Sequence, residues 1–287
     1  MKKLFTLTLA LAMTLSLAAC GSKPQNSPAQ PGAGSASSTP GTSASQPEPT
    51  ADPVEIFVFA AASMTETLNE IIEVYKTEAP NVTVTPTYDS SGTLLTQIQE
   101  GAECDLFLSA AQKQMNTLEK ESALLEGTRL DLLENKVTLA VPEGNSKGIE
   151  SFDQLAGLLK SGGVLLAMGN SDVPVGQYTQ KIFDYYQLDE GAMAAAGVLT
   201  YGSNVKEVTT QISEATVDCG LIYGTDAASA NLTVVDSATA EMCGQVIYPA
   251  AVLADSKHPD ETKAFLDYLQ TDACGQIFER VGFSPLF

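Results

Sequence analysis

Short apolar runs alternate with stretches of helical periodicity from Pro53 to the end of the chain. The runs have the length of strands and lie at residues 54–60, 82–88, 105–110, 136–141, 164–168, 219–223, 233–235 and 246–253. Between them, apolar side chains recur at helical spacing, and two further helices are expected at 259–269 and 272–281. This alternation predicts an α/β fold, with mixed but mostly parallel sheets that carry helices on both faces.

Two of the expected strands run directly into a serine that opens a helical pattern, Ser63 after the first strand and Ser91 after the second. In α/β sheets, ligands bind at the carboxyl ends of strands, where helices begin. A hydroxyl and free backbone N–H groups at the positive end of a helix can hold a small anion without a cationic side chain. The two serines therefore predict an oxyanion site.

Each serine also has a purely structural explanation. Ser63 and Glu66 form the Ser-x-x-Glu pattern of a capping box, and Ser91 followed by Gly92 is typical of a turn. From the residues alone, both explanations stay open beside the anion site.

The chain is strongly acidic, with 35 Asp and Glu against 15 Lys and Arg and a formal net charge of −20. Such a charge repels nucleic acids and anionic lipid surfaces, so we expect no nucleic-acid partner. It also gives an anionic ligand no long-range attraction. Any oxyanion must therefore be held by local dipoles.

The N-terminal segment has the pattern of an export signal. Lys2 and Lys3 precede an apolar run at 4–19 that is short for a membrane span, and residues 17–21 (LAACG) resemble the lipobox of bacterial lipoproteins. The resemblance implies a signal peptide at 1–19 and a lipid anchor on Cys20. Residues 20–52 are rich in Ser, Pro, Ala and Gly, which predicts a disordered linker that tethers the protein to the outer face of a cell membrane.

The remaining cysteines and the single histidine do not suggest a metal centre or a catalytic triad. Cys104, Cys219, Cys243 and Cys274 are far apart, without a C-x-x-C motif, so buried thiols and a disulfide are both open. His258 is the sole histidine and lies outside any motif, which leaves no evident base for a catalytic triad. We therefore expect that the protein is not an enzyme such as a serine hydrolase.

Several short motifs resemble, in order, the molybdate-binding proteins of bacterial ABC importers. The first half of the folded region contains residues 58–65 (VFAAASMT), 90–94 (SSGTL), 97–102 (QIQEGA), 105–110 (DLFLSA) and 112–113 (QK). The second half contains 173–178 (VPVGQY), 220–227 (GLIYGTDA), 248–252 (YPAAV) and 277–283 (IFERVGF). Together the motifs span nearly all of the expected fold.

The resemblance implies a two-lobed fold like that of periplasmic binding proteins, with two hinge crossings. Lobe I is expected at 53–138 and 249–287 and lobe II at 139–248, with crossings near Val137–Val141 and Val246–Val252. The implied protein is a monomer that closes on molybdate or tungstate and delivers it to an ABC permease. No cofactor is implied.

The family's ligand contacts fall on five residues of this chain. Ser63 and Ser91 correspond to the family's serines, Val175 and Val205 to two residues that offer backbone N–H groups, and Tyr223 to a tyrosine that offers its hydroxyl. All five supply neutral donors, and the metal is bound as an oxyanion, without direct ligands to a cation. A binding protein for sulfate or another oxyanion is the alternative, followed by a surface interaction module carried on the linker.

Overall fold

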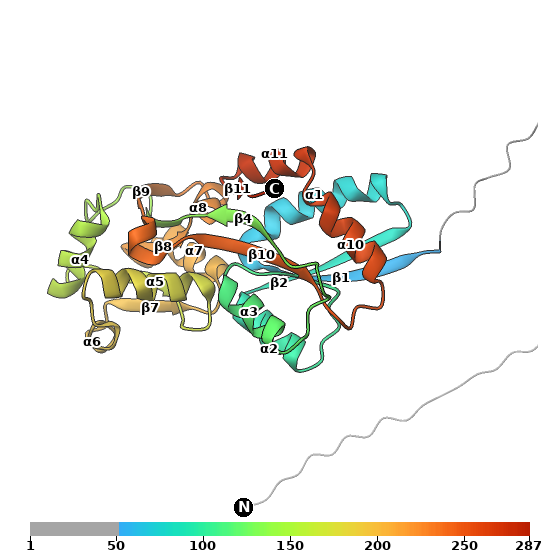
Figure 1. Cartoon of the computed structure of the whole chain (residues 1–287). Coiled ribbons are helices and arrows are strands. Elements are labelled where there is room, and N and C mark those ends of the chain that lie inside the picture. Colours follow the sequence, from blue (N-terminus) through green and yellow to red (C-terminus); the bar gives the residue numbers. More distant parts are fainter. Residues whose placement is uncertain (1–51) are drawn as a thin grey trace, which may run out of the picture. The chain divides into compact units, whose positions relative to one another are not determined.

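The computed structural model describes residues 52–287 (Figure 1). The expected signal peptide, Cys20 and nearly all of the linker lie outside these residues. These residues belong to one compact unit. Within it, two sheets with their helices form the two lobes expected from the sequence. No helix within 52–287 is long and apolar enough to cross a membrane.

Lobe I is built on a six-stranded sheet with the order β11-β4-β10-β3-β1-β2. Its strands are β1 (Val54–Ala61), β2 (Val82–Asp89), β3 (Leu106–Leu108), β4 (Leu130–Asn135), β10 (Val246–Val252) and β11 (Ser284–Pro285). Successive residues of β1 point to opposite faces, so Phe59 belongs to one buried cluster with Leu94 and Phe107, whereas Val58 belongs to another with Leu68. Both faces of this sheet are therefore buried.

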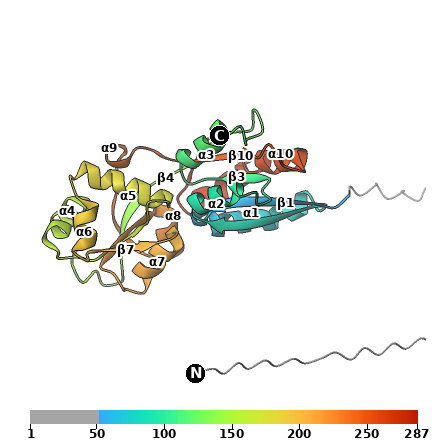
Figure 2. The same cartoon turned by 90° about the horizontal axis from the view of Figure 1, so that it is seen from below.

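Helices cover these two faces in separate groups. The short turn η1 (Ala62–Met64) leads from β1 into α1 (Thr65–Glu78), which packs with α11 (Asp272–Arg280). On the other face, α2 (Ser91–Gln99) packs with α3 (Gln112–Lys120). The remaining helix, α10 (Pro259–Tyr268), contacts β1 and β10. Figure 2 shows α1, α2, α3 and α10 around the strands of this lobe.

Lobe II is built on a five-stranded sheet with the order β7-β6-β8-β5-β9. Its strands are β5 (Val137–Val141), β6 (Leu166–Gly169), β7 (Leu199–Gly202), β8 (Cys219–Tyr223) and β9 (Thr233–Ser237). Its helices are α4 (Phe152–Ser161), α5 (Pro174–Tyr185), α6 (Glu190–Ala195), α7 (Val205–Ser213), α8 (Gly224–Ser229) and α9 (Ala240–Cys243).

The two sheets are mixed, and the expected excess of parallel pairs is wrong. Parallel pairing is confined to β1 with β2 and β3, and to β6 with β7 and β8. The strands next to the lobe crossings, β4, β5 and β10, pair antiparallel with their neighbours because they carry the chain out of one sheet and back.

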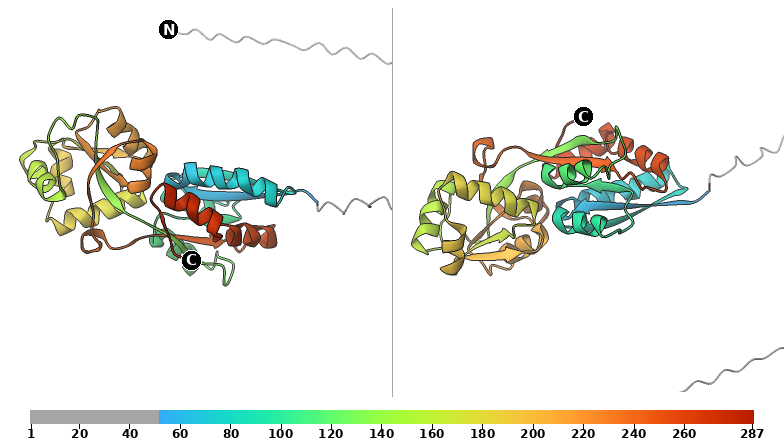
Figure 3. Two further views of the ribbon diagram at one scale, coloured as in Figure 1. Left: turned by 90° about the horizontal axis from the view of Figure 1, so that it is seen from above. Right: turned by 60° about the horizontal axis from the view of Figure 1, so that its bottom comes forward.

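The chain crosses between the lobes at Lys136 and again within residues 238–245 (Figure 3). Each crossing lies just before a strand rather than within it. All of β5, from Val137, pairs in the second sheet, while Val246 at the start of β10 pairs with Asn135 in the first. The residues at which the chain changes sheet thus lie a few positions from the lobe boundaries expected between residues 138 and 139 and between residues 248 and 249. Crossings fall where strand pairing stops, because a paired backbone cannot bend freely.

Candidate binding site between the two lobes

All five residues predicted as ligand contacts line one small cavity. Its walls come from both lobes and consist of Ala61, Ala62, Ser63, Asp89, Ser90, Ser91, Ala110, Val173, Pro174, Val175, Val205 and Tyr223. The volume of the cavity that the centre of a water-sized sphere can occupy is about 10 Å³. This volume is close to the smallest that admits one water molecule. The structure thus brings the predicted residues together around one small space.

On the lobe I side, Ser63 lies in η1, directly after β1. Its hydroxyl oxygen is 2.8 Å from the hydroxyl oxygen of Tyr248. The capping box with Glu66 is not formed, because the N-cap of α1 is Met64 and no side chain caps this end. The structural explanation of Ser63 as a cap is therefore wrong.

Ser91 is the first residue of α2, and Ser90 is its N-cap. The Ser90 hydroxyl accepts a hydrogen bond from the Thr93 N–H at 3.1 Å, as N-cap serines do. Ser91 is fully buried, and its hydroxyl accepts from the Ala110 N–H at 2.9 Å. Ser91 thus ties the start of α2 to the segment that follows β3.

On the lobe II side, two helices begin at the cavity. Val175 is the second residue of α5, after Pro174, and Val205 is the first residue of α7, after the N-cap Asn204. Backbone N–H groups of a first helical turn have no partner within the helix. Both valines are therefore placed to offer an N–H to a ligand.

Tyr223 ends β8 and is almost completely buried, with 1% of its surface exposed. Its hydroxyl is buried and has no hydrogen-bond partner, which is costly unless a ligand supplies one. Burial raises the pKa of Tyr223 well above 10. The phenol therefore keeps its proton and can act as a donor.

The positive field of the cavity comes from helix ends, since its lining contains no Lys, Arg or His. Helices α2, α5 and α7 all direct their N-termini to it. One carboxylate, Asp89, also lines the cavity. It accepts hydrogen bonds from the Ser90 N–H at 2.7 Å and from Asn204 of lobe II at 3.3 Å.

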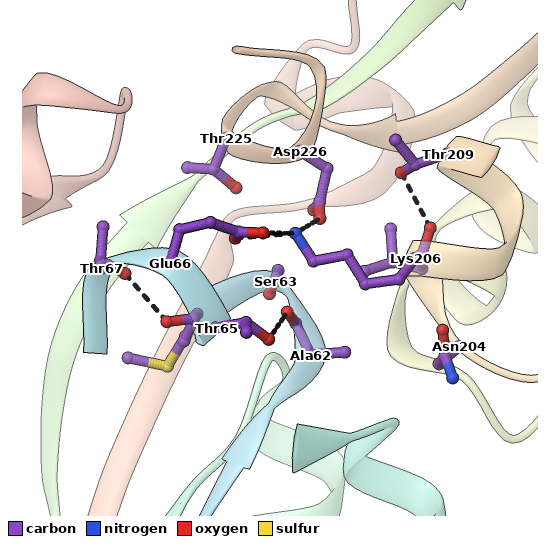
Figure 4. Close-up of polar contacts among 12 residues, drawn as sticks. Ala62, Ser63, Thr65, Glu66, Thr67, Asn204, Lys206, Thr209, Thr225 and Asp226 are labelled. Carbon is purple, nitrogen blue, oxygen red and sulfur yellow. Dashed lines mark hydrogen bonds and ion pairs between the residues drawn. The ribbon is translucent and has the colours of Figure 1, made fainter. Parts of the chain in front are cut away.

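A charged cluster beside the cavity joins the lobes (Figure 4). The Lys206 ammonium of lobe II lies 2.8 Å from the Glu66 carboxylate of lobe I and 3.1 Å from the buried Asp226 carboxylate. Burial alone would lower the pKa of Lys206, but Asp226 and Glu66 outweigh it and raise that pKa. Burial also raises the pKa of Asp226 to about 6, although Lys206 opposes the shift.

The lobes also meet through their backbones. A Cβ atom on Gly92, in the first turn of α2, would lie 2.1 Å from the Asp172 carbonyl oxygen, just before α5. Only glycine permits this approach without displacement. The contact and the Lys206 cluster hold the two walls of the cavity together.

Other features of residues 52–287 do not suggest a metal centre. Cys104, Cys219, Cys243 and Cys274 are buried free thiols, which decides against a disulfide among them. No group of His, Cys, Asp or Glu within this range could hold a metal ion. A larger cavity of about 380 Å³ lies in lobe I, but its walls include four carboxylates, those of Glu103, Asp105, Glu121 and Asp255, which disfavours an anion.

Fold and site define a class: a two-lobed α/β binding protein that encloses a small ligand between its lobes. Residues 56–284 match the sequence profile of the bacterial extracellular solute-binding proteins. The chain belongs to this family.

Two curated relatives extend the comparison. YvgL of Bacillus subtilis, whose name proposes an ABC transporter substrate-binding lipoprotein, is 32% identical over 80% of this chain and 86% of its own. The molybdate-binding protein ModA of Escherichia coli is 33% identical over 82% of this chain and 90% of its own.

Solved structures agree with the family assignment. The substrate-binding domain of a proposed molybdenum ABC transporter from Clostridium difficile is 31% identical, with a TM-score of 0.62 over 82% of this chain and all of that one. The periplasmic molybdate-binding protein of Azotobacter vinelandii shares the fold. It is 18% identical, with a TM-score of 0.69 over 79% of this chain and 98% of its own.

Proposed function

We propose that the protein captures molybdate or tungstate between its lobes and delivers the oxyanion to an ABC permease. Ser63, Ser91 and Tyr223 would donate from their hydroxyls, and Val175 and Val205 from their backbone N–H groups. The lobes would part about the two crossings to admit the ligand and close again around it. The names of ModA and of the Clostridium difficile domain support this ligand.

The observation that carries the proposal is the Tyr223 hydroxyl, a buried donor without an acceptor in a cavity surrounded by helix N-termini. A tetrahedral dianion offers several acceptors at once. Each hydrogen bond to a charged oxygen contributes about 1.5–3 kcal/mol. Neutral donors and helix ends can therefore replace the water of a dianion without a cationic side chain.

Thermal unfolding and titration calorimetry with molybdate, tungstate, sulfate and phosphate test the proposal. A ligand at 100 times its dissociation constant stabilises the folded protein by about 2.7 kcal/mol, which shifts the unfolding midpoint. We expect this shift with molybdate or tungstate. No response to either one would refute the proposed ligand.

Sulfate is the second candidate, because a sulfate-binding protein from Mycobacterium tuberculosis shares the fold. That protein is 16% identical, with a TM-score of 0.68 over 81% of this chain and 87% of its own. Sulfate is also a dianion with four oxygens, but it is smaller. A response to sulfate alone in the same titrations would assign the protein to this ligand.

We also propose that Cys20 carries lipid and anchors the protein outside the cytoplasm, as the lipobox-like residues 17–21 and the name of YvgL suggest. Wild-type protein should then partition into the detergent phase of a cell extract. A Cys20→Ser variant should lose this behaviour. Wild-type protein without lipid by mass spectrometry would contradict the anchor.

A further inference from the structure

The first turn of α7 is bonded to lobe I on both sides of Val205. Asn204, just before Val205, donates from its side-chain nitrogen to the Asp89 carboxylate at 3.3 Å. Lys206, just after it, donates to both oxygens of the Glu66 carboxylate, at 2.9 and 2.8 Å (Figure 4). In the part of the chain that the structure describes, the other side-chain hydrogen bonds lie within one lobe or at the crossings. Helix α7 is therefore the element of lobe II that side chains fasten to lobe I.

The two carboxylates belong to the segments that carry the lobe I serines. Asp89 ends β2, two residues before Ser91, and Glu66 lies in the first turn of α1, three residues after Ser63. Val205 itself lines the cavity between these two attachments. The bonds from α7 thus set where the Val205 N–H lies relative to both serines.

Donor and acceptor of the inner bond are each oriented within their own lobe. The Asn204 side-chain oxygen caps α7 by accepting from the Glu207 N–H at 3.1 Å. The Asn204 nitrogen, which can only donate, is left for lobe I. The Asp89 oxygen that receives it also accepts from the Ser90 N–H at 2.7 Å. Closure of the lobes brings together two groups that are already in place.

We propose that Asn204 and Lys206 are positioning residues that clasp the closed lobes and thereby set how slowly the ligand leaves. The clasp consists of the Asn204–Asp89 bond and the Lys206–Glu66 pair. The inference rests on the proposed function and extends it to the kinetics of release. Both bonds join the lobes, so they stabilise the closed complex and must break before the ligand can leave. The clasp also explains why a carboxylate, Asp89, lines a cavity for an anion, which it repels.

Asn204→Ser tests the inner bond. Serine keeps an oxygen that caps α7, but its side chain is too short to reach Asp89, and no charge changes. Isotope-labelled molybdate is bound, and its release into excess unlabelled molybdate is followed by rapid filtration. We expect release about tenfold faster than from wild-type protein, with a nearly unchanged association rate. In an Asp89→Ala background, Asn204→Ser should not speed release further, because no acceptor remains to be lost.

Exchange of the two side chains tests the same bond without loss of a partner. Asn204→Asp keeps the cap but sets two carboxylates against each other, so release should be faster. Adding Asp89→Asn restores a donor and an acceptor across the lobes with the net charge of wild-type protein. Release from this double variant should return to within about twofold of the wild-type rate.

Glu66→Ala tests the outer pair and leaves Lys206 its buried partner Asp226. Release should be about two- to fivefold faster, since the pair is partly exposed, and the difference should shrink at high salt. Glu73→Ala is the matched control, because Glu73 pairs with Lys76 within α1, and it should leave the release rate unchanged.

Circular dichroism and the unfolding midpoint establish that each variant folds, and the exchanged pair decides if Asn204→Ser does not. Unchanged release from Asn204→Ser, or an equal acceleration in the Asp89→Ala background, overturns the inference, since a role in capping α7 alone predicts the latter. Release from the exchanged pair as fast as from Asn204→Asp also overturns it. Wild-type protein that binds neither molybdate nor tungstate overturns the proposed function itself, and the inference falls with it.

Discussion

The two walls of the cavity present hydrogen-bond donors of different origin. Lobe I contributes the side chains of Ser63 and Ser91, and each hydroxyl already has a partner within the protein. Lobe II contributes backbone N–H groups at the starts of α5 and α7, together with the Tyr223 hydroxyl, which has no partner. Lobe I is therefore organised before a ligand arrives, whereas lobe II carries donors that a ligand must satisfy.

This difference suggests how the energy of binding is divided. Substitution in the lobe I wall breaks bonds within the protein as well as contacts to the ligand, so stability and affinity should fall together. Removal of a hydrogen-bond donor from the lobe II wall should lower affinity without lowering stability. Substitutions where the walls meet and within each wall test this separation.

The largest effect is expected at Lys206, which lies in lobe II and reaches Glu66 in lobe I. Lys206→Met leaves the Asp226 carboxylate buried without a cation, so the unfolding free energy at pH 8 should fall by about 3–5 kcal/mol. Urea denaturation measures the loss. Lys76→Met is the control, because its pair with Glu73 is exposed and contributes at most about 1 kcal/mol. Equal losses in the two variants would contradict a buried role for Lys206.

Asp226 should also give the stability a pH dependence. The pKa of Asp226 is raised from 3.8 to about 6 in the folded protein, so its contribution to stability is fully present below pH 3.8 and lost as pH rises through about 6. The difference between these two pKa values corresponds to about 3 kcal/mol. Relative to Asp226→Asn, wild-type protein should lose unfolding free energy between pH 4 and pH 6, as followed by urea denaturation. Parallel pH profiles would show that Asp226 does not titrate in this range.

Gly92→Ala tests the backbone contact between the walls. The added methyl group would lie 2.1 Å from the Asp172 carbonyl oxygen, so the lobes could not close fully. Molybdate affinity should fall by about 2–3 kcal/mol, a magnitude typical of overpacking, while the unfolding midpoint without ligand changes little. Gly157→Ala, within α4, is the control because a methyl group there meets no atom within 4 Å. Unchanged affinity in Gly92→Ala would show that the lobes close differently around the ligand.

Tyr223→Phe and Ser91→Ala compare the two walls directly. Both should lower molybdate affinity by about 2 kcal/mol, since each removes a hydroxyl from a charged acceptor. Ser91→Ala should also lower the unfolding free energy, by about 1–3 kcal/mol, because the Ala110 N–H loses its acceptor. Tyr223→Phe should not lower the stability of the free protein and should raise it by about 1–3 kcal/mol, because the hydroxyl is buried there without a partner. A stability loss in Tyr223→Phe would remove the distinction.

The same difference explains what the sequence could predict. A strand followed by a serine and a helical pattern indicated the lobe I wall, because side-chain donors depend on residue type. Val175 and Val205 were identified only through the family resemblance, since a backbone N–H is the same for nearly every residue. Which hydroxyl already has a partner within the protein could not be read from sequence.

Strand β4 was missed. In β4 the acidic residues Asp131 and Glu134 flank the buried pair Leu132 and Leu133, so the apolar run is too short to stand out. Tyr248 lay in a recognised motif but received no role, because its partners come from segments far apart in the chain. Helices α6, α7, α8 and α9 were also not expected. For α6, α8 and α9 the reason is their length, since each has at most six residues and hence little periodicity.

The smallest effect on affinity is expected at the two valines. Val175→Ala and Val205→Ala keep the backbone N–H and the start of the helix, so molybdate affinity should change by less than about 0.5 kcal/mol in titration calorimetry. Both side chains are buried, and their truncation should nevertheless lower the unfolding free energy by about 1–2 kcal/mol. A loss of affinity as large as that of Tyr223→Phe would mean that the valine side chains, rather than the N–H groups, shape the cavity. The lobe II wall would then depend on residue type as much as the lobe I wall does.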